Sequence, residues 1–267
     1  MALYEQLCRE TGPLLLVTGA GVSVASGLPV FRGSEPNAVW NQRIIERGTL
    51  KYFWEDPAES WSWYLDRFDA LLGRKPNPAH HAIAALEAWQ TTRGGDFLLV
   101  TQNVDALHET AGSRSYVEVH GRTDRVRCAA RECELAAPRG SLARDEAMLK
   151  AFRQERTEAN LPRCPSCGEL LRPHVLWFDE RYDGHVDFQI ARVLRAAKRA
   201  RTILFAGTSF SVGVTAMIVE TGLRRGAKLF SIDPSGRIPH QRVHVIAEPA
   251  EEALPTLVSR LPKPVQR

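Results

Sequence analysis

His120, Asn103 and Asp105 are the residues of the stretch 101–121 whose side chains could act on a substrate. A histidine side chain has an ordinary pKa of about 6.5, so it can serve as a general base at neutral pH. The amide and the carboxylate could orient a ligand beside it. A short apolar run precedes each group, and polar residues just past the ends of buried strands lie where open α/β sheets bind ligands. We therefore expect the three side chains to face one crevice.

A glycine-rich turn, GAGVSVASGLPVFRG at 19–33, follows the first apolar run of the chain. Its backbone N–H groups could hold phosphate oxygens, with Gly19 and Gly21 allowing close approach and Ser23 adding a hydroxyl group. The glycine spacing differs from the dinucleotide fingerprint GxGxxG, so the turn taken alone is equally consistent with a purely structural role.

Two later segments could bind the rest of a nucleotide. Gly207, Thr208 and Ser209 follow another apolar run and offer a second phosphate or ribose site. Asp233 ends the run 228–232. A carboxylate at this position could bind a ribose diol and would repel a 2′-phosphate, which favours NAD over NADP.

The five cysteines comprise Cys8 and two close pairs. The pairs, Cys128 with Cys133 and Cys164 with Cys167, could supply four thiolates to one tetrahedral zinc ion. Four protein ligands would close the coordination sphere, so such a zinc ion would be structural and would not activate water. Unligated or redox-active cysteines are the alternative.

Five apolar runs have the length and character of buried parallel strands. They lie at 14–17, 97–100, 117–119, 202–206 and 228–232. Helical patterns at 79–89, 186–200 and 214–224 separate several of these runs. This alternation predicts an α/β fold built on a doubly wound parallel sheet.

Two segments interrupt the alternation. Residues 34–78 are rich in aromatic side chains, and Trp61, Leu65 and Phe68 share one helical stripe, which predicts a helical insertion packed on the main domain. Residues 122–172 hold the paired cysteines and many charges with little apolar periodicity. A segment so poor in core-forming residues usually needs a metal to fold, so we expect a zinc-binding module here.

Charge and composition limit the classes of function. The net charge is +4 over 267 residues and no run of lysine or arginine stands out, so nucleic-acid binding is not implied. The N-terminus lacks the apolar run of a signal peptide, and no early stretch is long enough to span a bilayer. Cysteines in a metal-ligand pattern fit the reducing cytoplasm, so we expect a cytoplasmic protein without membrane association.

The motifs together resemble the sirtuins, which are NAD-dependent protein deacylases. The matching stretches occur in family order over nearly the whole chain: the glycine turn, PN-x-x-H at 76–80, TQNVDALHETAG at 101–112, HG at 120–121, the paired cysteines, LRPHVLWFDE at 171–180 and GTS at 207–209. In domain terms, 1–33, 79–121 and 173–267 would form a Rossmann-like NAD-binding domain, 34–78 a helical insertion and 122–172 the zinc-binding module.

The resemblance assigns cofactor contacts to most of the polar residues named above. Ala20, Gly21, Thr208 and Ser209 would contact the phosphates and ribose of NAD, Gln102 and Asn103 the ribose beside nicotinamide, and Asp105 the nicotinamide carboxamide. Phe31 and Arg32 would lie on a flexible cofactor loop.

The resemblance also implies the reaction and its substrate. The chain would remove acyl groups from lysine, releasing nicotinamide and O-acyl-ADP-ribose, with His120 as the base and Asn103 ordering water. The acyl-lysine protein or peptide would bind as an added strand beside Val175, Leu176, Trp177 and Phe178.

Tyr64 and Arg67 resemble the Y-x-x-R pair of class III sirtuins, which remove succinyl, malonyl or glutaryl groups. Their i,i+3 spacing puts both on one helix face, and an arginine can bind a carboxylate through two parallel hydrogen bonds. Gly48 would leave room for a long acyl chain. We therefore expect removal of succinyl- or malonyl-type groups and also of acetyl; a solvated Arg67 is the alternative.

Three residues depart from the family pattern. Val30, Asp179 and Asp233 stand where sirtuins usually carry Asp, Gly and Asn. An ADP-ribosyltransferase or NAD hydrolase on the same fold, or a non-catalytic NAD-sensing module, are the alternative functions. The sequence leaves the oligomeric state open.

Overall fold

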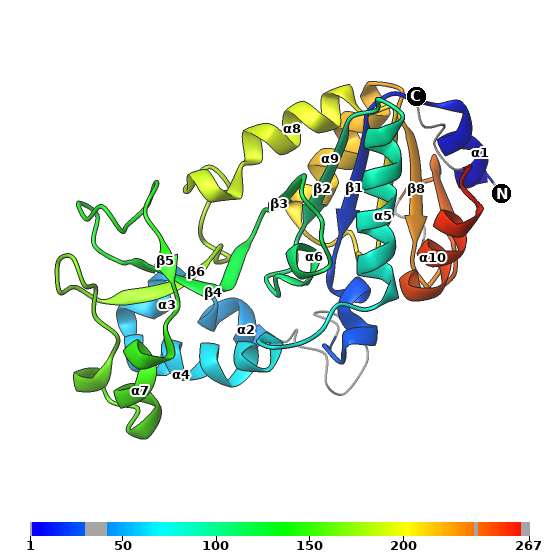
Figure 1. Cartoon of the computed structure of the whole chain (residues 1–267). Coiled ribbons are helices and arrows are strands. Elements are labelled where there is room, and N and C mark those ends of the chain that lie inside the picture. The colour runs from blue at the N-terminus through cyan, green and yellow to red at the C-terminus, as the bar shows by residue number, and fades with distance from the viewer. Residues whose placement is uncertain (1, 30–41, 238–239, 263–267) are drawn as a thin grey trace.

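The computed structural model describes residues 2–29, 42–237 and 240–262, without the side chains of residues 42–44. Its larger lobe is built on a six-stranded parallel sheet in the order β3-β2-β1-β7-β8-β9 (Figure 1). The strands are β1 (Leu14–Thr18), β2 (Phe97–Thr101), β3 (Tyr116–Glu118), β7 (Thr202–Ala206), β8 (Lys228–Ile232) and β9 (Val243–Ile246). This is the strand order of a doubly wound dinucleotide-binding fold.

The five strands expected from apolar runs are all present, and the α/β fold class is confirmed. The sixth strand, β9, was not expected. It pairs only with β8 at the edge of the sheet, and of its four residues only Val243 is buried. A half-solvated edge strand has no need of a continuous apolar run, which is why the sequence pattern does not show it.

Helices cover both faces of the sheet. One face carries α1 (Ala2–Arg9), α5 (Pro78–Thr92) and α10 (Ala250–Arg260), and the other carries α8 (Ile190–Arg199) and α9 (Gly213–Arg224) (Figure 1). Alternate residues of each strand enter the two cores: Leu14 and Leu16 of β1 face α5, whereas Leu15 and Val17 face the α8 side. Strands buried on both faces read as continuous apolar runs.

One helix prediction needs correction. The helix expected over 186–200 is interrupted at Gln189, whose φ of 44° separates a 3-10 turn (Val186–Phe188) from α8. A short helix, α6 (Leu107–Thr110), follows β2 and begins only after Ala106, which takes a φ of 60° directly after Asp105. Left-handed backbone ends helical hydrogen bonding whatever the apolar spacing around it.

A smaller lobe is built on an antiparallel sheet in the order β5-β4-β6, which lies at the left of Figure 1. Its strands are β4 (Gly121–Cys128), β5 (Leu142–Ala143) and β6 (Leu171–Val175). Its helices are α2 (Gln42–Arg47), α3 (Leu50–Glu55), α4 (Pro57–Phe68) and α7 (Glu146–Gln154), with a 3-10 turn at Asp69–Leu71.

The helical insertion shares a core mainly with the cysteine-bearing segment, and it also contacts the main domain, where the Asn77 amide donates to the carbonyl of Val22. Phe53, Trp61 and Leu65 share one core with Val126, Leu149, Phe152 and other residues of the cysteine-bearing segment. The indole of Trp61 also donates to the backbone carbonyl of Leu171 at 2.8 Å. Each segment has too few apolar residues for a core of its own, and the two together complete one.

The loops that follow β1 and β7 meet at the point where the chain turns to opposite sides of the sheet. The N–H group of Gly21 donates to the carbonyl of Gly207 at 2.9 Å. A Cβ atom on Gly21 would lie 2.7 Å from the Gly207 Cα, and Gly207 itself has a φ of +57°. Both positions therefore require glycine.

We expect Gly21→Ala to destabilise the protein by about 1–3 kcal/mol, as overpacking of a tight contact generally does. Gly213→Ala is the matched control, because its Cβ would meet only Tyr182 Cε2, at 3.9 Å. Urea unfolding of the two variants and the parent chain measures the difference. Equal stability of the two variants would show that the loops can separate without cost.

Candidate active site

His120 follows β3 and stands half-buried at the carboxyl edge of the parallel sheet. Its Nδ1 lies 2.9 Å from the carbonyl oxygen of Gln102, which can only accept. Nδ1 therefore carries the proton of the neutral ring and Nε2 is the free base. Burial lowers the pKa of His120, and the bond to the Gln102 carbonyl opposes this. The ring is thus neutral at pH 7, in the form that accepts a proton.

Asn103, Ser23 and Asp105 form one hydrogen-bonded chain next to this histidine. The Asn103 amide donates to Ser23 Oγ at 3.0 Å, and Ser23 Oγ donates to Asp105 Oδ2 at 2.7 Å. The other carboxylate oxygen accepts from the backbone N–H of Leu107 at 3.1 Å. Burial raises the pKa of Asp105, and the Ser23 hydrogen bond opposes the shift.

Gln102 connects three strand ends. Its side-chain amide donates to the carbonyl of Thr18 and to Thr208 Oγ1, both at 3.1 Å. Its own carbonyl holds His120, as described above. The structure thus brings together the residues that the sequence placed at the ends of β1, β2, β3 and β7.

The loops after β1 and β7 suit the phosphates of a dinucleotide. Within the described chain, the backbone N–H groups of Ala20, Thr208 and Ser209 take part in no hydrogen bond. Ala20 also begins a 3-10 turn (Ala20–Ser26) that Gly19 precedes. Unpaired N–H groups at such a turn are the usual donors to phosphate oxygens.

Asp233 lies at the end of β8, where a nucleotide ribose was expected. In the structure its Oδ1 accepts from the backbone N–H of Ser235 at 2.9 Å and from the Ser235 hydroxyl. The residues Phe31 and Arg32, like Val30, lie outside the described part of the chain, so their expected place on a cofactor loop stays a prediction.

The four paired cysteines converge on one point of the smaller lobe. Their Sγ atoms lie within 4.8 Å of one another, with 3.5 Å between Cys128 and Cys167 and 3.7 Å between Cys133 and Cys164. Thiolates about 2.3 Å from a tetrahedral zinc ion are separated by about 3.8 Å, so the set fits zinc. Backbone N–H groups of Ala130 and Leu135 approach Cys128 and Cys133 and would stabilise the thiolates.

A second cluster, His174, His185 and Asp187, fits a metal less well. The Nδ1 of His185 accepts from the Asp187 backbone, and its Nε2 faces the Gly140 carbonyl, each at 3.1 Å. The Arg127 guanidinium lies 3.5 Å from His174. Arg127 is positively charged, and both ring nitrogens of His185 already have hydrogen-bond partners. We therefore interpret the cluster as a hydrogen-bonded group that stabilises β6.

The expected acyl-pocket pair, Tyr64 and Arg67, stays a prediction, and the two side chains have different surroundings. Tyr64 is 1% exposed in the core of the smaller lobe, and burial raises its pKa, with Arg144 and Asp69 as its nearest charges. Arg67 is half-buried over the ring of Trp63, at 5.4 Å from the ring centroid. Within the described residues no hydrogen bond joins Tyr64 to Arg67.

Arg67 nevertheless faces a second cation. Burial and the nearby Arg47 lower the pKa of the Arg67 guanidinium. Arg67 has no acidic partner among the described residues, whereas Arg47 pairs with Glu59 at 2.9 Å. Gly48 comes directly after Arg47.

The segment Val175–Phe178, expected to bind the peptide, already uses three of its N–H groups. Leu176 donates to the His120 carbonyl at 2.8 Å, Phe178 to the Gly48 carbonyl at 3.0 Å, and Trp177 to Glu180 Oε2 at 3.0 Å. An added strand would have to pair through other groups of this segment. Through Leu176 and Phe178 the segment does, however, connect His120 to Gly48, which directly follows Arg47 at the end of α2.

Sequence reasoning missed two titratable residues beside the histidine. The Tyr182 hydroxyl lies 3.3 Å from His120 Nε2, and the two rings stack. Glu118, two residues before His120, has its pKa raised to about 7 by burial, with Arg122 opposing the shift. The alternation of the short strand could have indicated Glu118. Nothing local indicates Tyr182, which lies 62 residues further along the chain, in the loop after β6, and packs on the α8–α9 side of the large lobe.

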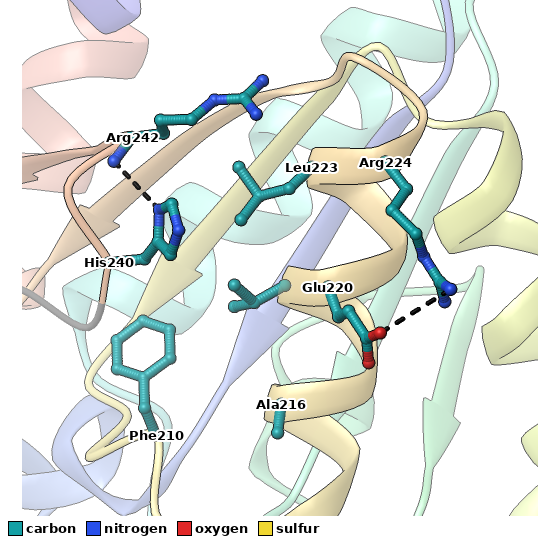
Figure 2. Close-up of a pocket in the computed structure, with 8 residues that line it drawn as sticks. Phe210, Ala216, Glu220, Leu223, Arg224, His240 and Arg242 are labelled. Carbon is teal, nitrogen blue, oxygen red and sulfur yellow. Dashed lines mark hydrogen bonds and ion pairs between the residues drawn. The ribbon is translucent and has the colours of Figure 1, made fainter.

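A groove of about 500 Å³ runs along α9, apart from these residues. Figure 2 shows Phe210, Leu223 and His240 around it, with Arg224 and Arg242 at its upper end. No residue of the proposed active site lines it, and nothing in the structure shows what covers it. In the described part of the chain, moreover, no helix is both long and apolar enough to cross a membrane.

Comparison with known proteins identifies the family. Residues 19–214 match the model of the Sir2 family. The chain is 38% identical over 261 residues to the NAD-dependent protein deacylase 1 of Pseudomonas aeruginosa, covering 97% of this chain and 98% of that one. The chain therefore belongs to the Sir2 family.

Two solved structures show the same fold. An ADP-ribose complex of a mutant Sir2 homologue superposes with a TM-score of 0.80 at 32% identity, covering 97% of this chain and 95% of that one. A Sir2 complex with a p53 peptide and NAD⁺ gives 0.77 at 25% identity, covering 97% of each chain. With the cysteine cluster, they confirm the Rossmann-like sheet with a zinc-type module; the domain boundaries given above stay predictions.

We expect the purified protein to hold one zinc ion per chain and to lose it in Cys164→Ser. Zinc binding contributes directly to folding, so this variant should be destabilised by at least about 2 kcal/mol. Cys8→Ser is the matched control, since Cys8 lies in α1, far along the chain from the cluster. Elemental analysis and thermal unfolding provide the measurements, and full stability of a zinc-free Cys164→Ser would contradict the structural role.

Proposed function

We propose that the chain is an NAD-dependent protein-lysine deacylase, which moves the acyl group of a modified lysine to ADP-ribose and releases nicotinamide. The observation that carries this proposal is a neutral His120 whose Nδ1 proton is fixed on the Gln102 carbonyl, which leaves Nε2 as the basic nitrogen, at a sheet edge with unpaired N–H groups suited to a dinucleotide. Family membership and the deacylase names of its relatives support it.

NAD, when bound, supplies an electrophilic ribose carbon from which nicotinamide can leave. The N–H groups of Ala20, Thr208 and Ser209 would hold the phosphates, with the turn at Gly19, Gly21 and Gly207 allowing the approach. Gln102 and Asn103 would hold the ribose beside nicotinamide, and Asp105 its carboxamide. Ser23 orients both Asn103 and Asp105 through the hydrogen bonds described above.

His120 would act as general base at Nε2. It takes a proton from a ribose hydroxyl, and the fixed Nδ1–H···O=C bond to Gln102 stabilises the imidazolium that results. The Tyr182 hydroxyl lies 3.3 Å from Nε2, so a ribose hydroxyl that gives its proton to Nε2 would have to take over this contact. Val175, Leu176, Trp177 and Phe178 would contact the acyl-lysine protein; the chain's place of action would be the cytoplasm.

The same proposal includes a preference for acidic acyl groups such as succinyl and malonyl. Arg67 supports it, because a partly buried guanidinium without an acidic partner next to Arg47 is stabilised by an added carboxylate. Gly48, which directly follows Arg47, would leave room there for a long acyl chain. Tyr64 supports it less, because its side chain is buried in the core of the smaller lobe and makes no hydrogen bond to Arg67 within the described residues.

We expect His120→Ala to fold and to bind NAD but to lose at least about 100-fold in deacylation rate, the usual share of a general base. His81→Ala is the control, because His81 is an exposed histidine of α5. Release of nicotinamide and of the free lysine peptide should be measured together. Full activity of His120→Ala would show that His120 is not the base. Transfer of label from NAD to protein without deacylation would favour an ADP-ribosyltransferase.

We expect the parent chain to prefer succinyl-lysine over acetyl-lysine peptides and Arg67→Met to lose that preference by about tenfold. A desolvated charge-assisted pair contributes about 1.5–3 kcal/mol, and only the acidic acyl group can form it. Arg195→Met, an exposed position on α8, serves as control. The ratio of kcat/KM values on the two peptides decides, and an unchanged ratio in Arg67→Met would refute the acidic pocket.

A further inference from the structure

Asp179 makes a contact that the family pattern does not provide for. It directly follows the segment Val175–Phe178, at the position where the resemblance leads one to expect glycine. Its Oδ1 accepts from the backbone N–H of Leu50 at 2.7 Å, and its Oδ2 accepts from that of Lys51 at 3.0 Å. The carboxylate thus binds the first two residues of α3, which belongs to a distant part of the chain.

The N–H groups of Leu50 and Lys51 would otherwise have no partner within their helix. The first N–H groups of a helix always lack intrahelical acceptors, and a carboxylate there is also favoured by the helix dipole. The helix's own cap, Thr49, accepts only from Tyr52, at 3.0 Å. Asp179 therefore supplies acceptors that α3 does not supply itself.

A third hydrogen bond runs beside these two. The N–H group of Phe178 donates to the carbonyl of Gly48 at 3.0 Å, so Phe178–Asp179 and Gly48–Lys51 are joined at three points. Phe53 of α3 also packs against Trp177, with 5.5 Å between ring centroids. The turn after the proposed peptide segment is thus fixed to Gly48 and the start of α3, directly after Arg47 at the end of α2.

The opposite side of the same turn is anchored by buried charge. Glu180 accepts from Arg127 at 2.7 Å and from both Nη1 and Nη2 of Arg172 at 2.8 Å. The Arg172 guanidinium lies 3.5 Å from the ring centroid of Trp177. Glu180 thus holds one side of the turn to β4 and β6, and Asp179 holds the other side to α3.

We propose that Asp179 is a positioning residue for the acyl-lysine substrate, which sets the spacing between Phe178 and the Gly48 loop. This inference rests on the proposed deacylase function. The residue touches neither the cofactor nor the reacting atoms; it acts through the two backbone segments that would contact the peptide and the acyl chain. Its loss therefore weakens substrate binding and leaves the cofactor site at the sheet edge intact.

The test is the kinetics of Asp179→Gly, which restores the residue expected from the family. The KM for the acyl-lysine peptide should rise about five-fold, the effect of losing a capping carboxylate. The KM for NAD and kcat should change less than about two-fold, because the contact between Asp179 and α3 stabilises the bound substrate and the transition state equally. Asp179→Asn, which keeps one carbonyl oxygen for the Leu50 N–H, should give an intermediate KM.

Thr49→Ala is the matched control, because it removes a cap from the same helix without cutting the link to Asp179. It should lower thermal stability as much as Asp179→Gly and leave the peptide KM unchanged. An equal rise of KM in Thr49→Ala, or no rise in Asp179→Gly, overturns the proposal.

Amide hydrogen exchange separates a failure of this inference from a failure of the proposed function. Exchange at Leu50 and Lys51 should be faster in Asp179→Gly than in the parent chain, and this measurement needs no activity. A parent chain that deacylates no peptide overturns both the function and the positioning role. Active parent protein with unchanged exchange and unchanged KM in Asp179→Gly overturns only the positioning role.

Discussion

The close backbone contact between the loops after β1 and β7 is the constraint on which the rest of the site depends. Gly21 and Gly207 approach so closely that a single added Cβ would collide with backbone. The chain turns to opposite faces of the sheet at this point, so the N–H groups of both loops face the same edge. Gln102 then connects this contact to β2 and, through its carbonyl, to His120. The orientation of the base thus follows from the packing of two glycine turns.

The smaller lobe depends on a shared core and not on the metal alone. Trp61, Leu65 and Phe53 of the helical insertion pack against Val126, Phe152 and Leu171 of the cysteine-bearing segment. The cysteine cluster joins the loop after β4 to the loop before β6 at the edge of this core. The buried Arg172–Glu180–Arg127 group ties this lobe to the segment that runs past His120. A buried carboxylate between two arginines is costly unless all three are hydrogen bonded, as they are here.

Much of the large lobe was predictable because its physical signal is local. The four inner strands β1, β2, β7 and β8 are almost wholly buried and read as apolar runs, whereas the edge strand β9 carries the exposed His244 and gives no such signal. The start of α5 was equally local: Asn77 caps it and Pro78 occupies its first position. Helix 186–200 was interrupted because Gln189 adopts a left-handed conformation that residue types alone do not require.

The amino-acid sequence by itself determined the class of fold, the set of polar residues at the sheet edge and the four cysteines, because each depends on residue type and short spacing. Only the tertiary structure decided which of these groups touch. It directed the Tyr64 hydroxyl into a core and left Arg67 beside Arg47, although both residues share a helix face in sequence. It brought Tyr182 to His120 and Asp179 to α3. Such contacts join segments more than fifty residues apart. They form because the whole chain packs into one structure, and no local sequence pattern contains that packing energy.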